Sequence, residues 1–243
     1  MPRGVRSTPV ARATRARRNE RSPAPRPPRT QRERTDTSKG DLLAAALELI
    51  AERGYRGASL AAIGERAGYS RGLVTEHFGS KEGLLRELVS RLMTGWRSLV
   101  LAEDVGEKRG VEAMSAVVLA HRSAIQQAPA AVRALYVLLF ESVLELSSVR
   151  EEFEKMDAAI LRVAVDYMRK GQEAGTVRAD VDVEAQATLT LAVIRGITMQ
   201  WMADPEAMDL DRVYDALARW LEHGLSVSSP TSRPARSAKP SRR

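Results

Sequence analysis

The sequence predicts an all-α protein of about nine helices, with a small three-helix domain at the N-terminus and a larger helical domain after it. Apolar residues recur three and four positions apart through most of the chain, and no segment alternates in the manner of a strand. Ser, Asp and Gly residues stand where helices should begin and end. Hydrophobic residues make up 44% of the 243 residues, which is enough to form a core.

The composition argues against several classes of protein. Cysteine is absent, so there is no disulfide, cysteine metal ligand or thiol nucleophile, and we expect a reducing, cytoplasmic location. No apolar run approaches the roughly 18 residues that span a bilayer, so no membrane contact is expected. Three dispersed histidines and the lack of a phosphate-binding glycine loop predict no catalytic residue, metal or cofactor, and argue against an enzyme.

The first helix is predicted to begin at residue 37, because Ser38 and Asp41 have the spacing of a capping box. Its apolar stripe runs through residues 42–50, and the helix is expected to end at Gly54.

Residues 59–81 contain two short predicted helices separated by a tight turn. Ser59 has the position of an N-cap, and Gly68 suits the left-handed residue that ends the first helix. Ser70 can cap the second helix, whose polar face and length fit a DNA major groove. The stretch is a helix-turn-helix signal and predicts DNA binding.

Six further helices are predicted from the apolar periodicity and the Pro and Gly positions: residues 81–103, 111–127, 131–146, 149–174, 183–202 and 210–225. The helix over 131–146 is apolar on nearly all faces and is expected to be central and buried.

Charge is divided unevenly along the chain. Residues 1–36 carry +8, residues 37–103 carry +1, residues 104–226 carry −7, and residues 227–243 carry +5. Both ends are rich in Arg, Pro and Ser and are predicted to be disordered. Flexible cationic tails raise affinity for DNA without adding sequence information. The alternative is that both tails are solvated and have no role in binding.

The segment LLAAALELIAERGYRGASLAAIGERAGYSRGLVTEHFGSKEGLLREL resembles the N-terminal DNA-binding domain of TetR/AcrR-family transcriptional regulators. Its most specific part is the S-R-G-x-x-x-x-H-F-x-S-K-E pattern that begins at Ser70. Gly64 departs from the family's Ala, and Thr75 departs from an aromatic residue that commonly contacts the DNA backbone.

The resemblance implies seven DNA-contacting residues: Ser59, His77 and Lys81 at phosphates, and Ser70, Arg71, Leu73 and Thr75 in the groove. Arg71 is the expected base reader, because a guanidinium can form two hydrogen bonds with a guanine edge. A phosphate contact is the alternative for Arg71.

The resemblance also implies a DNA-binding domain over residues 37–82 and an effector-binding and dimerisation domain over residues 83–226. Large or adaptable apolar side chains are the candidate ligand-binding residues: Trp96, Met114, Val118, Tyr136, Phe140, Phe153, Met156 and Met168. We expect an unknown small-molecule effector that is largely apolar. A filled core is the alternative, because periodicity does not distinguish a filled core from a hollow one.

In the family, the last two helices of two copies form a four-helix dimer interface. The candidate interface residues are Leu189, Val193, Arg195, Ile197, Trp201, Leu217, Trp220 and Leu221. Arg195 is expected to pair with an acid across this interface, with an anionic ligand group as the alternative. Core within one chain is the alternative for the stripe, and His121 is expected at a helix surface.

The sequence therefore predicts a homodimeric, ligand-responsive repressor that binds a palindromic operator in double-stranded DNA and is released by its effector. The effector is expected to shift helix 81–103 relative to the DNA-binding domains. The alternative function is a ligand-independent architectural DNA-binding protein, which the basic tails would favour.

Overall fold

The computed structural model describes residues 30–100 and 108–227, and within these residues it contains nine α-helices and no named strand. The helices are α1 (Gln31–Gly57), α2 (Leu60–Ala67), α3 (Arg71–Phe78), α4 (Lys81–Val100), α6 (Gly110–Gln127), α7 (Pro129–Leu144), α8 (Arg150–Glu173), α9 (Val183–Ala203) and α10 (Leu210–Leu225). A single 3-10 turn, Ser147–Val149, leads into α8. The predicted all-α fold is confirmed.

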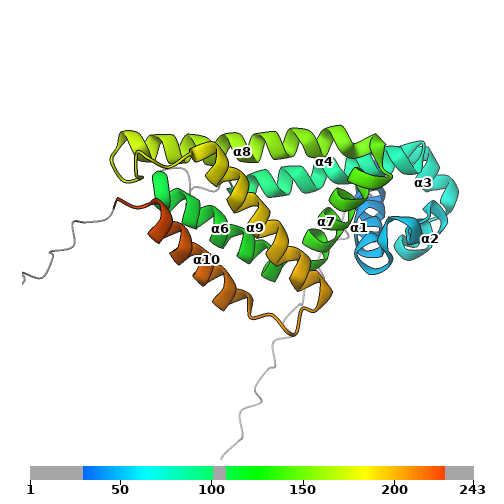
Figure 1. Ribbon diagram of the computed structural model, residues 1–243. Coiled ribbons are helices and arrows are strands. Elements are labelled where there is room, and N and C mark those ends of the chain that lie inside the picture. The colour runs from blue at the N-terminus through cyan, green and yellow to red at the C-terminus, as the bar shows by residue number, and fades with distance from the viewer. Residues whose placement is uncertain (1–29, 101–107, 228–243) are drawn as a thin grey trace, which may run out of the picture.

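The helices form a small head and a larger body (Figure 1). Helices α1, α2 and α3 gather at one end of the molecule, and α4 leads from α3 into the body. Helices α6, α8, α9 and α10 form the rest of the body, with α6 packed against both α8 and α10, and α8 runs along the top of the molecule back toward α4 and α7. Helix α7 stands between the two parts and packs along α1.

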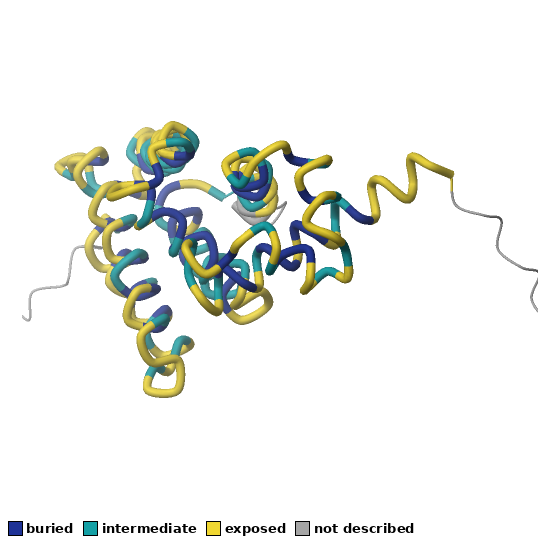
Figure 2. The backbone as a smooth tube through the Cα atoms, turned by 90° about the vertical axis from the view of Figure 1, so that its right-hand side faces the viewer, coloured by how far each residue is buried: buried dark blue, intermediate teal, exposed yellow. Residues whose placement is uncertain are grey.

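The start of α1 differs from the prediction. The helix begins at Gln31, and Thr30 caps it through a capping box in which Thr30 N–H donates to the Glu33 carboxylate at 2.7 Å. The predicted start at residue 37 is therefore wrong, and residues 31–36 do not belong to a disordered arm. Figure 2 shows these first turns as an exposed projection, which explains why they lack the apolar periodicity on which the prediction rested. The remaining tail predictions lie outside the described residues.

The head has its own apolar core, formed where one face of each helix meets the others. Leu42, Ala46 and Ile50 of α1 are buried against Ile63 of α2 and Val74 of α3, together with the first turns of α4. Arg66 of α2 adds ion pairs to Glu48 and Glu52 of α1. These contacts hold the helices of the head together.

Gly64 lies inside α2 where the turn passes closest to that helix. A Cβ atom at this position would lie 2.8 Å from the carbonyl oxygen of Tyr69. The residue is glycine because the backbone of the turn occupies the space that an Ala side chain needs.

No single helix of the described chain has the length and hydropathy to cross a bilayer. Helices α6 and α7 pass that test only as a pair, and the pair is bent by 109°.

Candidate DNA-binding surface and effector cavity

Both short helices of the head begin at the predicted serine caps. The Ser59 Oγ accepts a hydrogen bond from Ala62 N–H, and the Ser70 Oγ accepts one from Leu73 N–H, each at 3.2 Å. Gly68 ends α2 with a φ of 77°, so the left-handed residue required by the turn is present. The helix-turn-helix geometry is confirmed, while DNA contacts from the two exposed serines stay predictions.

The polar face of α3 points to solvent at its first turn. Arg71 and Thr75 are exposed and Leu73 is half-buried, so all three reach the surface of the recognition helix. The Thr75 hydroxyl donates to the Arg71 carbonyl at 3.2 Å, and Arg71 forms no ion pair with any residue in the described ranges. Arg71 is therefore the available cation at the start of α3.

His77 and Lys81, the other two predicted phosphate contacts, are engaged within the protein. The His77 Nε2 lies 2.9 Å from the Ser38 Oγ and joins α3 to α1. The Lys81 ammonium donates to the Tyr55 carbonyl at 2.7 Å and lies 3.9 Å from the centre of the Tyr55 ring, and burial lowers its pKa. A phosphate contact from either side chain must share these partners, and it stays a prediction.

A polar groove of about 380 Å³ lies between the first turns of α1 and the recognition helix α3. Arg34 and Thr37 line one side, and Leu73 and Glu76 line the other. Sequence reasoning missed this groove because it assigned the residues before 37 to a disordered arm. The T-x-x-E spacing that begins at Thr30 is the sequence pattern that indicates this earlier helix start.

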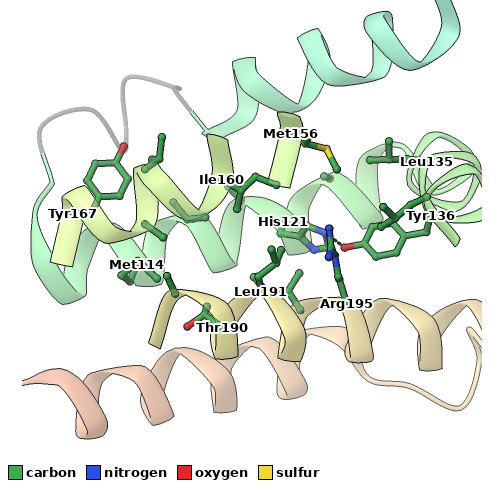
Figure 3. Close-up of a pocket in the computed structure, with 18 residues that line it drawn as sticks. Met114, His121, Leu135, Tyr136, Met156, Ile160, Tyr167, Thr190, Leu191 and Arg195 are labelled. Carbon is green, nitrogen blue, oxygen red and sulfur yellow. Dashed lines mark hydrogen bonds between the residues drawn. The ribbon is translucent and has the colours of Figure 1, made fainter. Parts of the chain in front are cut away.

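A cavity of about 70 Å³ lies in the body between α6, α7, α8 and α9 (Figure 3). Met114, Tyr136 and Met156 line it, as three of the eight predicted ligand-binding residues. Val118, Phe153 and Met168 do not line it and are buried in the core.

Two further predicted ligand-binding residues also fall outside the cavity lining. Phe140 is 38% exposed and packs edge-on against Tyr136, so its prediction as a cavity residue is wrong. The side chain of Trp96 lies outside the described part of the chain. Helical periodicity placed these residues on apolar faces but did not show which neighbouring helix each face meets.

His121 lines the cavity, which contradicts its predicted place at a helix surface. Its Nδ1 lies 2.7 Å from the Tyr214 hydroxyl, and its Nε2 lies 3.1 Å from the Tyr136 hydroxyl. Burial lowers the pKa of His121 to about 4, so the ring is neutral near pH 7. A neutral imidazole donates through one nitrogen and accepts through the other, which satisfies both tyrosine contacts. Sequence reasoning missed this group because its partners are 15 and 93 residues away.

Arg195 also lines the cavity, and its partner is Asp157 of α8 in the same chain. The predicted role of Arg195 in an ion pair across a dimer interface is therefore wrong. The two side chains are 26% and 30% exposed, so the ion pair lies close to solvent beside the cavity. Figure 3 shows the Arg195 side chain close to His121 and Tyr136 at that end.

The predicted interface stripe on the last two helices separates into two sets. Ile197, Trp201, Leu217 and Leu221 are buried within the chain. Leu189, Val193 and Trp220 are 53%, 37% and 50% exposed. Met199, which is not among the predicted interface residues, is 61% exposed. The four buried residues belong to the core of one chain, which was the alternative to a dimer interface. Of the predicted interface residues, the three exposed ones are available for contact with a second copy.

The head presents a short, exposed recognition helix, and the helical body holds an apolar cavity. Together these two features indicate a DNA-binding regulator. Residues 42–88 match the family described as bacterial regulatory proteins, tetR family. Residues 110–226 match the BetI-type transcriptional repressor C-terminal family. The chain therefore belongs to the TetR family of transcriptional regulators, which are DNA-binding proteins and not enzymes.

Individual relatives agree with this assignment. The chain is 24% identical over 185 residues to the fatty acid metabolism regulator protein of Bacillus subtilis, covering 76% of this chain and 93% of that protein. A TetR transcriptional regulator from Chloroflexus aurantiacus has a similar fold, with a TM-score of 0.71 and 21% identity over 80% of this chain and 99% of that one. FadR from Bacillus subtilis, solved with stearoyl-CoA, gives a TM-score of 0.67 at 23% identity, covering 76% of this chain and 98% of that one.

Proposed function

We propose that the protein is a homodimeric, ligand-responsive repressor that binds a palindromic operator and releases it when a small, largely apolar effector enters the cavity. The observation that carries this proposal is the position of α7. Leu135, Tyr136 and Leu139 of α7 line the cavity, and the same helix packs along α1 of the head. A displacement of α7 is thereby transmitted directly to the DNA-binding domain.

The size of the cavity supports a mechanism in which the effector moves the helices. A volume of about 70 Å³ is far below the roughly 300–1,000 Å³ of ordinary ligand sites, so a ligand must displace the walls. Met114 and Met156 are flexible lining side chains that adapt to such a change. An effector that binds only the expanded state favours that state by its difference in affinity for the two.

The contact between head and body gives this movement a defined route. Arg56 at the end of α1 pairs with Glu145 just after α7, and α1 and α7 pack against each other. The sequence placed the coupling in helix 81–103, whereas α7 touches both the cavity and the head. We infer that α7 carries the displacement and that α4 follows it.

Dimerisation is supported by the exposed apolar residues of α9 and α10. Leu189 and Val193 are one turn apart on α9, and Trp220 is exposed on α10. Exposed apolar patches on soluble proteins commonly mark interaction sites. Two recognition helices in one dimer read two half-sites, which accounts for a palindromic operator.

Fluorescence anisotropy with DNA from beside the protein's own gene tests the proposal. We expect salt-dependent binding that prefers one site over a shuffled duplex, and a complex that contains two copies of the chain. The relative solved with stearoyl-CoA supports including apolar chain compounds among the effectors that are screened. Binding that shows no preference between the two duplexes would refute the proposal and favour the architectural function.

A further inference from the structure

The cavity is elongated along α8. Its residues Met156, Ile160, Ala164 and Tyr167 line the cavity, spanning three turns of the helix or about 16 Å. Figure 3 shows Tyr167 at one end of the row, while Arg195 and His121 lie toward the other end. The cavity therefore suits an extended molecule that lies along α8 more than a compact one.

Three polar groups of the lining have partners within the protein. The two nitrogens of His121 contact two tyrosine hydroxyls. The Thr190 hydroxyl donates to the Gln186 carbonyl at 2.8 Å. The Arg195 guanidinium pairs with Asp157. Apart from the Tyr167 hydroxyl and the remaining N–H groups of Arg195, a ligand meets polar side chains that already have partners among the described residues, so it gains most from apolar contact.

Among the lining residues in the described part of the chain, Arg195 alone carries a formal charge at neutral pH, because His121 is neutral. Asp157 cancels that charge. A ligand carboxylate beside Arg195 would share the guanidinium with the Asp157 carboxylate. Repulsion between these two carboxylates would offset the attraction of the ligand to the guanidinium. A ligand without a charge avoids both this repulsion and the desolvation of a carboxylate.

We propose that the Arg195–Asp157 pair makes the cavity selective for an elongated, uncharged apolar molecule and against the carboxylate with the same chain. This inference rests on the proposed effector role of the cavity. It assigns Asp157 as a specificity-determining residue that acts through Arg195, since Asp157 itself is not part of the lining.

Isothermal titration calorimetry on the full chain tests the inference with decanol, decanoate and decylammonium, which share one alkyl chain and differ in charge. The wild-type protein should bind decanol at least about tenfold more tightly than either ion, a difference of about 1.4 kcal/mol. Equal or tighter binding of decanoate, or no binding of decanol, overturns the inference.

The Asp157→Asn variant provides a gain-of-function test. It leaves the positive charge of Arg195 without a partner, so the affinity for decanoate relative to decanol should rise by about tenfold. Asp166→Asn is the matched control, because Asp166 pairs with Lys170 on the exposed side of the same helix and should leave all three affinities unchanged. An unchanged ratio in folded Asp157→Asn overturns the role of Asp157.

Arg195→Gln is the opposite variant and serves equally if Asp157→Asn does not fold. This variant leaves the negative charge of Asp157 without a cationic partner, so the binding preference of the cavity should shift toward decylammonium. The absence of that shift contradicts the inference.

DNA binding, measured separately by anisotropy, distinguishes this inference from the proposed function. Selective DNA binding without any decanol binding refutes the ligand class alone. Decanol binding that leaves the DNA complex intact refutes the effector response but not the selectivity of the cavity.

Discussion

Arg71 stands at the first turn of the recognition helix, exposed and without an ion-pair partner among the described residues. If Arg71 reads a guanine, Arg71→Ala should weaken operator binding by about 1–3 kcal/mol and reduce the preference over a duplex altered at that base pair. Anisotropy titrations on the two duplexes measure both effects. Arg162→Ala on the exposed face of α8 is the control. A uniform loss on both duplexes would identify a phosphate contact and contradict base reading.

His121 gives the body a predictable response to acid. Its folded-state pKa of about 4 lies below the ordinary value of 6.5, so the unfolded chain binds the proton first as pH falls. Its contribution to stability is therefore intact above about pH 6.5 and is lost progressively toward pH 4. Between pH 7 and pH 5 the loss should be about 2 kcal/mol.

Urea denaturation of the wild type and of His121→Gln at these two pH values checks that prediction. The glutamine amide retains a donor and an acceptor but does not titrate, so its unfolding free energy should change less over this range. Parallel pH dependence in the two proteins would show that His121 is not the titrating group.

At the scale of the element, α2 is shaped by the backbone that follows it. Gly64→Ala should lower the unfolding free energy even though Ala favours a helix by about 1 kcal/mol, because the new Cβ would lie 2.8 Å from the Tyr69 carbonyl oxygen. Gly40→Ala in α1 is the control, since nothing lies within 4 Å of a Cβ there, and it should stabilise the protein. Thermal melts compare the two. A stabilised Gly64→Ala variant would contradict the close approach.

Helix α9 presents the apolar surface that we assign to a second copy. Val193→Glu should convert the dimer to a monomer and weaken operator binding, because a charge would be buried between two apolar faces. Sedimentation velocity measures the oligomeric state. Ala158→Glu on the exposed face of α8 controls for the added charge. A dimer that persists in Val193→Glu would place the interface elsewhere.

Helix boundaries, caps and the recognition turn follow from local sequence, and for this reason they were predictable. Ser59, Gly68 and Ser70 act through neighbours within four positions, and their predicted places at the helix ends are confirmed. The error at the start of α1 has a local cause, because a polar helix held by the Thr30 cap shows no apolar stripe. The cavity was only partly predictable. Its defining contacts, such as His121 with Tyr214 and Arg195 with Asp157, join helices distant in sequence.

At the scale of the whole molecule, deletion of the basic N-terminal segment tests whether operator recognition can be separated from general DNA affinity. Residues 1–29 carry nine Arg and one acid. Deleting them, while keeping Thr30 so that α1 remains capped, should weaken DNA binding and reduce its salt dependence but preserve operator preference. Anisotropy at several salt concentrations measures all three quantities. Loss of the preference on deletion would favour the architectural alternative.

In the proposed mechanism, α7 joins sequence-selective DNA binding to an apolar cavity within one molecule. The most direct measurement is fluorescence anisotropy of the full chain on its selected operator, titrated with decanol at fixed protein and DNA concentrations. We predict that decanol releases the operator in a saturable manner, whereas decanoate at the same concentration does not. A complex that stays intact while calorimetry shows decanol bound would contradict the coupling between cavity and head.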